Sequence, residues 1–232
     1  MNEHGELDAI RARYARRASL PAQRYSRFNA EVLARVHERE CSTAALLASH
    51  GIRSLKGLDV VEVGCGNGAN LLEFLQFGAE PERLVGNELL AERLEQARCR
   101  LPAAVRLMPG DACELPFGEA SFDIVYQSTV FSSILDDAFQ QRLAARMWQW
   151  LRPGGGILWY DFTYNNPRNA DVRGVPLARI RALFPAGSVD ARRVTLAPPI
   201  ARRVAPLHPA LYTLFNLVPA LRTHLLCWIG KP

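Results

Sequence analysis

The stretch LDVVEVGCGNG, residues 58–68, decides the fold because it joins a short apolar run to a cluster of glycines. Its first half, residues 58–63, is rich in β-branched side chains, which is typical of a strand buried on both faces of a parallel sheet. The glycines predict a tight turn, and residues 70–77 then have helical spacing. This part of the chain therefore predicts a strand, a glycine-rich turn and a helix.

Strand and helix signals continue to alternate after this turn. Further strands are predicted at residues 83–88, 105–108, 122–126 and 156–161, and helices at 90–101, 138–151 and 177–184. Such alternation predicts a doubly wound, mostly parallel sheet. The last part departs from it, because strands at 190–196 and 225–230 are separated by a helical insert of about residues 198–223, in which a proline-punctuated helical stretch covers about residues 206–222. Without a packed crossover helix, these strands are expected to pair antiparallel.

The first fifty residues predict a helical cap in front of an α/β domain over residues 51–232. Tyr25, Phe28, Val32 and Val36 recur at helical spacing, and Pro21 is expected to interrupt the helix. The whole chain has 232 residues, enough for one such domain with a substantial core.

Composition favours an ordinary cytoplasmic protein. Five cysteines are scattered without a Cys-x-x-Cys pair, which is typical of reduced thiols and predicts neither a disulfide framework nor a metal site. No uninterrupted apolar run is long enough to span a bilayer. The polar opening MNEHGE is unlike a signal peptide.

The formal net charge of +5 comes mostly from arginine, and part of it is clustered near the start of the chain. Such a cluster could meet a nucleic acid or an anionic substrate. The alternative, which we favour, is a solvated helix face. The clustered residues are Arg11, Arg13, Arg16, Arg17, Arg24 and Arg27.

The glycine turn also predicts a ligand, because backbone without a Cβ can approach a bound molecule closely at a helix N-terminus. Its spacing is G-x-G-x-G and differs from the G-x-G-x-x-G of dinucleotide sites. Glu88 ends the second strand at the interval expected of a carboxylate that accepts hydrogen bonds from ribose hydroxyls. Asp111 follows the third strand, where an acidic side chain can reach an adenine amino group.

These motifs, in this order over about residues 58–162, resemble those of the class I S-adenosylmethionine-dependent methyltransferase superfamily, of the bacterial small-molecule type. The resemblance implies a Rossmann-like, doubly wound, seven-stranded sheet with an antiparallel last strand, and S-adenosyl-L-methionine as cofactor. It implies that the glycine turn holds the methionine part, that Glu88 holds the ribose and that Asp111 meets the adenine edge. The implied cofactor-binding residues are Glu62, Gly64, Cys65, Gly66, Gly68, Glu88, Leu89, Asp111, Ala112 and Gln127, the last just after the fourth strand.

The resemblance implies methyl transfer to a small acceptor, with O-methylation of a natural-product, sugar or glycolipid-type molecule as the leading expectation. An oxygen nucleophile needs a base. Asp161, at the end of the fifth strand, and His208, in the insert, are the catalytic candidates, although a structural role is favoured for each. Replacing His208 with alanine is predicted to lower turnover and to spare cofactor affinity.

Three rival interpretations stay open. The arginine cluster would suit an RNA or DNA methyltransferase, but the segment 127–130 lacks the Asp/Asn-Pro-Pro-aromatic signature of base-methylating enzymes. A non-catalytic cofactor-binding partner subunit is disfavoured by the intact glycine turn with Glu88 and Asp111, because a degenerate domain has no need to keep them. A nicotinamide dehydrogenase is opposed by the glycine spacing. The acceptor, the atom methylated and the oligomeric state are left open.

Overall fold

A seven-stranded sheet forms the centre of the molecule, which we describe from a computed structural model over residues 3–18, 26–166 and 169–232. The strand order is β3-β2-β1-β4-β5-β7-β6. β7 runs antiparallel to both of its neighbours, and the other pairs are parallel, as predicted. The strands are β1 (Val60–Val63), β2 (Leu84–Glu88), β3 (Arg106–Pro109), β4 (Phe122–Ser128), β5 (Leu151–Phe162), β6 (Ser188–Leu196) and β7 (Arg222–Gly230).

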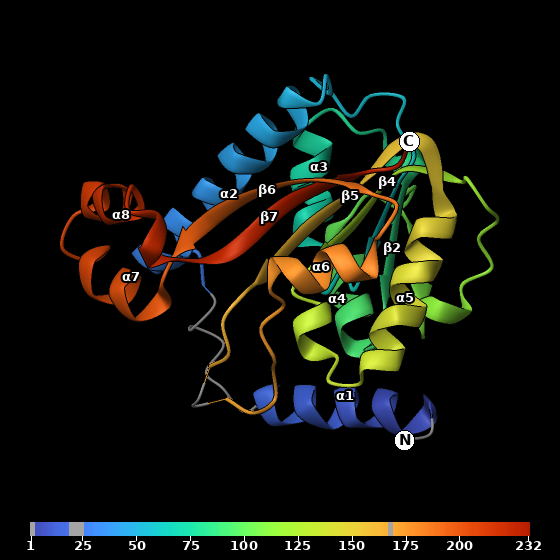
Figure 1. Ribbon diagram of the computed structural model, residues 1–232, viewed down its shortest axis with the longest axis horizontal. Coiled ribbons are helices and arrows are strands. Elements are labelled where there is room, and N and C mark those ends of the chain that lie inside the picture. The colour runs from blue at the N-terminus through green and yellow to red at the C-terminus, as the bar shows by residue number, and fades with distance from the viewer. Residues whose placement is uncertain (1–2, 19–25, 167–168) are drawn as a thin grey trace.

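Helices cover both faces of this sheet because alternate strand residues point to opposite sides (Figure 1). Val60, Ile124 and Leu158 pack on the side of α2 (Ala30–Ser49), α3 (Ala69–Gln76) and α4 (Ala91–Arg100). Their neighbours Val61 and Val125 pack on the side of α5 (Asp137–Trp150) and α6 (Leu177–Leu183). Two apolar layers therefore enclose the sheet.

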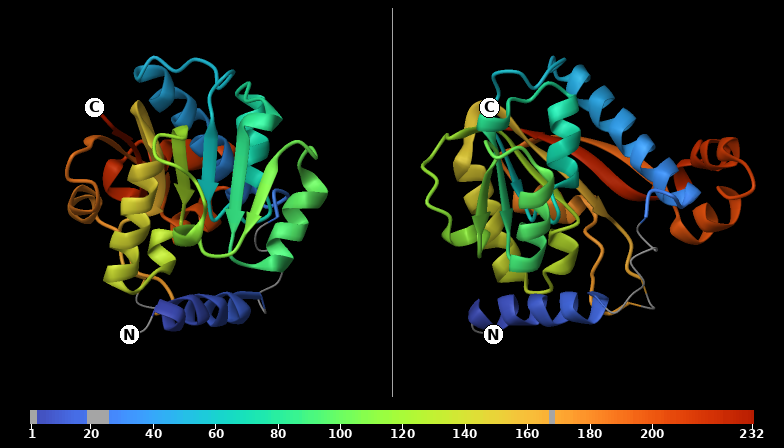
Figure 2. Two further views of the ribbon diagram at one scale, coloured as in Figure 1. Left: turned by 90° about the vertical axis from the view of Figure 1, so that its right-hand side faces the viewer. Right: turned by 180° about the vertical axis from the view of Figure 1, so that it is seen from behind.

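The N-terminal helix α1 (Glu3–Ala18) lies across the edge at which the parallel strands end (Figure 2). Its buried Glu6 accepts hydrogen bonds from Arg13, at 2.6 Å, and from the backbone N–H of Leu135, at 2.8 Å. Arg13 also donates to the carbonyl of Ser133, just beyond β4, at 3.1 Å. Of the predictions for this part of the chain, those on Pro21, Arg24, Tyr25 and the side chain of Arg17 lie outside the described residues.

The insert between β6 and β7 is helical, as predicted, but its helices begin earlier than the predicted stretch of about residues 206–222. They are α7 (Pro198–Val204) and α8 (Pro209–Asn216), each with proline in its first turn. This helical arm extends away from the sheet (Figure 1). Short 3-10 turns complete the fold: η2 (Pro81–Arg83), η3 (Ala112–Glu114), η4 (Phe131–Ser133) and η5 (Pro219–Leu221).

β5 begins at Leu151, five residues before the predicted start of the fifth strand, and therefore contains Gly154, Gly155 and Gly156. A Cβ on Gly156 would come within 2.1 Å of the ring of Trp228 on β7, so this glycine makes room for the indole. Sequence spacing gave no sign of this cross-strand contact. Within the described residues, no helix is long and apolar enough to cross a membrane.

Candidate cofactor site

The glycine turn after β1 has a backbone shape that only glycine adopts without strain. Gly64 and Gly66 have φ values of +67° and +58°, in the left-handed region. A Cβ on Gly64 would lie 2.6 Å from the side chain of Val130, which therefore packs directly on the turn. At Gly66 the nearest atom to such a Cβ is the guanidinium of Arg93, at 3.8 Å, which leaves the backbone there open to a ligand.

Glu88, at the carboxyl end of β2, ties the glycine turn to the next loop. One oxygen of its buried carboxylate accepts the backbone N–H of Gly66 at 2.8 Å, and the other accepts that of Leu90 at 2.9 Å. Each carboxylate oxygen can accept a further hydrogen bond. The side chain is therefore fixed in place and can still accept a pair of hydroxyl groups.

Glu62 lies beneath the same turn and is fully buried. Its Oε1 accepts a hydrogen bond from Asn70 at 2.6 Å, whereas its Oε2 has no partner among the described residues. Burial raises the pKa of this carboxyl from 4.5 to about 8. A buried acceptor without a donor is costly, and an ammonium donor, such as the amino group of a bound methionine moiety, would satisfy it.

Asp111 follows β3 on the neighbouring loop. Its Oδ1 caps η3 by accepting the backbone N–H of Cys113 at 2.9 Å. Ala112 is buried beside it, and Leu89, just after β2, is partly buried against the same core. The loops after β1, β2 and β3 thus bring the predicted residues to one edge of the sheet.

Two predicted cofactor residues have clear packing roles. Gln127 lies inside β4, which runs on to Ser128, and its side chain is fully buried. The prediction that it follows the strand is wrong, because β4 extends one residue beyond it. Its amide group forms hydrogen bonds with the backbone of Val130, at 3.1 Å, and of Tyr160, at 3.4 Å. Cys65 is buried, and a Cβ on Gly86 would lie 2.8 Å from its Sγ. Both side chains support the turn from below.

The two catalytic candidates are not brought together. Asp161 is fully buried near the end of β5, where its oxygens accept the backbone N–H groups of Ser132, at 3.0 Å, and Phe162, at 2.9 Å. Burial raises its pKa from 3.8 to about 7. His208 is exposed on the helical arm, where its Nδ1 accepts the backbone N–H of Ala210 at 3.1 Å and so caps α8.

Several residues at this edge were not found from the sequence. The ring of Tyr14 on α1 stacks on Arg93 of α4 at 4.8 Å, so α1 reaches the residue beside Gly66. Asn70, in the first turn of α3, holds Glu62. The helical spacing of α1 could not reveal which loop it covers, because that depends on packing between segments far apart in the chain.

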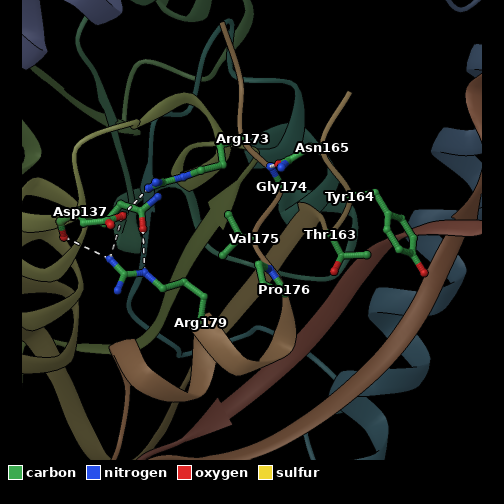
Figure 3. Close-up of a pocket in the computed structure, with 10 residues that line it drawn as sticks. Asp137, Thr163, Tyr164, Asn165, Arg173, Gly174, Val175, Pro176 and Arg179 are labelled. Atoms are coloured by element: carbon green, nitrogen blue, oxygen red, sulfur yellow. Dashed lines mark hydrogen bonds and ion pairs between the residues drawn. The ribbon is translucent and has the colours of Figure 1, made fainter. Parts of the chain in front are cut away.

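A cavity of about 420 Å³ lies beyond β5, between the loop that follows it and α5 and α6 (Figure 3). Its wall has hydroxyl, amide and charged groups. Arg173 and Arg179 both pair with Asp137, and Arg179 also donates to Gln140 at 3.0 Å. The other side is lined by Thr163, Tyr164 and Asn165.

Taken together, the residues fit S-adenosylmethionine: a glycine turn open to close approach, a fixed carboxylate for the ribose hydroxyls and a buried carboxyl oxygen that lacks a donor. Gly66 would lie against the methionine part of the cofactor, Glu88 would hold its ribose, and Glu62 would hold its amino group.

Known proteins are similar in sequence to the central part of this chain. Residues 60–155 match the family described as "Methyltransferase domain". The chain is 33% identical over 106 residues to the demethylmenaquinone methyltransferase of Deinococcus radiodurans, covering 44% of this chain and 42% of that protein. It is 31% identical over 116 residues to the tRNA N(3)-methylcytidine methyltransferase Mettl2 of Drosophila melanogaster, covering 47% and 35%. The chain thus spans less than half the length of these curated relatives.

The fold of the chain is also found in solved structures. The structure of an S-adenosylmethionine-dependent methyltransferase from Mesorhizobium loti superposes with a TM-score of 0.59 at 18% identity, covering 80% of this chain and 95% of that one. The sheet order, the glycine turn and the matched domain agree with one another. Residues 60–155 are thus similar to the methyltransferase domain family, and the chain shares its fold with a solved S-adenosylmethionine-dependent methyltransferase.

Proposed function

We propose that this chain transfers the methyl group of S-adenosylmethionine to a small-molecule acceptor. The observation that carries the proposal is Glu88, whose carboxylate is fixed by two backbone N–H groups at the sheet edge and keeps acceptor capacity for a ribose. Glu62, beside it, supplies a buried oxygen that suits the cofactor's amino group.

The cofactor supplies an activated methyl group on a sulfonium, so the chemistry left to the protein is positioning and exclusion of water. Val130 packs on the glycine turn and limits how a ligand can lie there. The helix α1, anchored by the buried Glu6–Arg13 pair, covers the same edge. These contacts would hold the reacting groups in line and keep the edge dry.

We place the acceptor in the cavity beyond β5. Its polar wall, with Thr163, Asn165 and Arg173, suits a hydroxyl-rich molecule of the sugar, glycolipid or natural-product type better than a purely apolar one. Asp161 lies under this region with a pKa near neutrality. We propose that it acts mainly by holding η4 through the N–H of Ser132, since both of its oxygens already accept backbone hydrogen bonds.

Methyl transfer is tested by incubating the purified chain with S-adenosylmethionine labelled on its methyl group and a panel of acceptors: sugars, glycolipids, phenolic natural products and total tRNA. We expect label to enter a hydroxyl-bearing small molecule, and Glu88→Ala to abolish the transfer. Label in tRNA alone would contradict the proposed acceptor class. Tight cofactor binding with no transfer to any acceptor would favour a non-catalytic partner subunit.

The RNA alternative receives little support from the arginine cluster. Arg11, Arg16 and Arg27 pair with Asp8, Asp171 and Glu40 at 2.9, 2.5 and 3.7 Å. Arg13 is buried with Glu6. Guanidinium groups already paired with carboxylates give a weaker field for phosphates than free ones.

His208 can be tested by a matched pair of variants, because asparagine also caps helices whereas alanine does not. Alanine removes both the imidazole and the cap, and asparagine removes only the imidazole. We expect turnover to fall in His208→Ala and to be retained in His208→Asn, with the cofactor Kd unchanged in both. Loss of turnover in both variants would instead give the imidazole itself an acid–base role.

A further inference from the structure

The outer side of the helical arm carries a cluster of exposed apolar side chains. We call this cluster the arm face. Its members from α8 and the turns on either side of it are exposed by between 38% and 76% of their surface: Leu207, Leu214, Phe215, Leu217 and Val218. Soluble proteins seldom leave so many large apolar side chains together in water, and such clusters mark interaction surfaces.

The arm is held from its inner side, so that this face points away from the domain. Glu38 of α2 accepts hydrogen bonds from the hydroxyl of Tyr212, at 2.9 Å, and from the amide of Asn216, at 2.8 Å. The same carboxylate accepts the backbone N–H of Thr195, at 2.8 Å, near the end of β6. Tyr212 and Asn216 are buried, and Leu214 and Phe215, between them in sequence, are exposed. α8 is thus bound on one side and uncovered on the other.

The charged side chains of the arm segment itself are all basic. Residues 191–232 contain no aspartate or glutamate but six lysines and arginines. Arg202 and Arg203 lie in the last turn of α7, next to the apolar cluster in the arm, and both are exposed. Arg202 pairs with the partly buried Glu31 of α2 at 3.6 Å. Apolar side chains beside exposed arginines, in a segment that has no acidic residue of its own, are the pattern of helices that lie in a membrane interface.

The position of the arm relates this surface to the cofactor site. β7 begins at Arg222, opposite Leu196 of β6, and Phe162 near the end of β5 pairs with His224. The arm extends from one end of the long strands β6 and β7 (Figure 1). This is the end at which the parallel strands finish, and the glycine turn follows β1 at the same end.

We propose that the arm face docks on an anionic lipid bilayer, with α8 lying in the interface and the arginines of α7 among the headgroups. Charge complementarity selects this occupant. A second copy of the chain would bring the same basic arm segment to a symmetric contact, and the repulsion between like charges would oppose that contact. The inference concerns a docking surface and goes beyond the proposed methyl transfer.

The test is co-sedimentation of the full chain with vesicles of phosphatidylcholine alone and of phosphatidylcholine mixed equally with phosphatidylglycerol. We expect binding to the mixed vesicles to be at least about tenfold tighter and to weaken as salt is raised. Leu214→Asp with Leu217→Asp should lower this binding at least about tenfold. Arg202→Glu with Arg203→Glu should lower it by a similar factor.

Arg53→Glu with Arg100→Glu is the matched control, since it changes the net charge equally at exposed sites outside the arm. It should keep most of the binding. Equal binding by all variants, or no preference for phosphatidylglycerol, would overturn the proposal. So would a dimer of the free chain that Leu214→Asp with Leu217→Asp dissociates, because a second copy would then occupy the face. An unchanged cofactor Kd in these variants shows that the domain is folded and keeps this outcome separate from that for methyl transfer.

Discussion

Replacing Glu88 with alanine is expected to raise the Kd for S-adenosylhomocysteine at least about 100-fold. Each hydrogen bond to a charged group such as a carboxylate is worth about 1.5–3 kcal/mol, and a ribose offers two hydroxyl donors. The variant also loses the bonds that fix the turn, from the N–H groups of Gly66 and Leu90 to the carboxylate. We therefore expect a fall of about 2 kcal/mol in the free energy of unfolding as well. Calorimetric titration and urea denaturation measure the two effects separately.

Glu92→Ala is the control for this experiment, because Glu92 is an exposed carboxylate in the first turn of the neighbouring α4. Its Kd should stay within about twofold of that of the unmodified chain, as expected of an exposed group without a ligand contact. A folded Glu88→Ala variant that binds as tightly as the unmodified chain would show that the ribose lies elsewhere.

Glu62→Gln is expected to make the ligand-free chain more stable at high pH and to weaken its cofactor binding. The folded pKa of Glu62 is raised from 4.5 to about 8 by burial. The folded state thus holds this proton more tightly than the unfolded state. The stability that depends on it is fully present below pH 4.5 and is lost as pH rises through about 8. Glutamine stays neutral, and the variant should be more stable at this upper pH by roughly 2–4 kcal/mol.

Urea denaturation across this pH range measures the effect, with Glu92→Gln as the exposed control. Asp161, whose pKa is raised to about 7, also lowers the free energy of unfolding as pH rises. It does so equally in the unmodified chain and in Glu62→Gln, so the difference between their stability curves reports Glu62. The same substitution should weaken cofactor affinity about tenfold, because a carboxylate oxygen for the amino group is lost. A Glu62→Gln variant that is less stable than the unmodified chain at high pH would contradict the account of this buried carboxyl.

The strands of the central sheet could be predicted because their sequence signals are local. Residues 58–63 and 122–126 are short β-branched or aromatic runs bounded by turn residues, and each became a strand within two or three residues of its expected bounds. The arm was only partly predictable. Prolines at 198, 199 and 209 can begin a helix as well as interrupt one, and spacing alone did not show that the first helix of the insert begins at Pro198.

The site shows the same division. The glycine turn and Glu88 could be placed from the sequence, since each directly follows or ends a strand and parallel strands end at one edge. The place of Gln127 relative to the fourth strand could not be predicted correctly, because it depends on how far β4 extends. The contacts of α1 with η4 and Arg93 join residues about 80 to 120 positions apart, and no local pattern encodes such pairs.

A crystal structure of the chain with S-adenosylhomocysteine tests the central claim most directly. The account predicts that both ribose hydroxyls lie within hydrogen-bonding distance of the Glu88 carboxylate and that the homocysteine amino group approaches Glu62 above the glycine turn. A nucleoside bound away from Glu88, or a turn that closes against Val130 and keeps the nucleoside out, would contradict it.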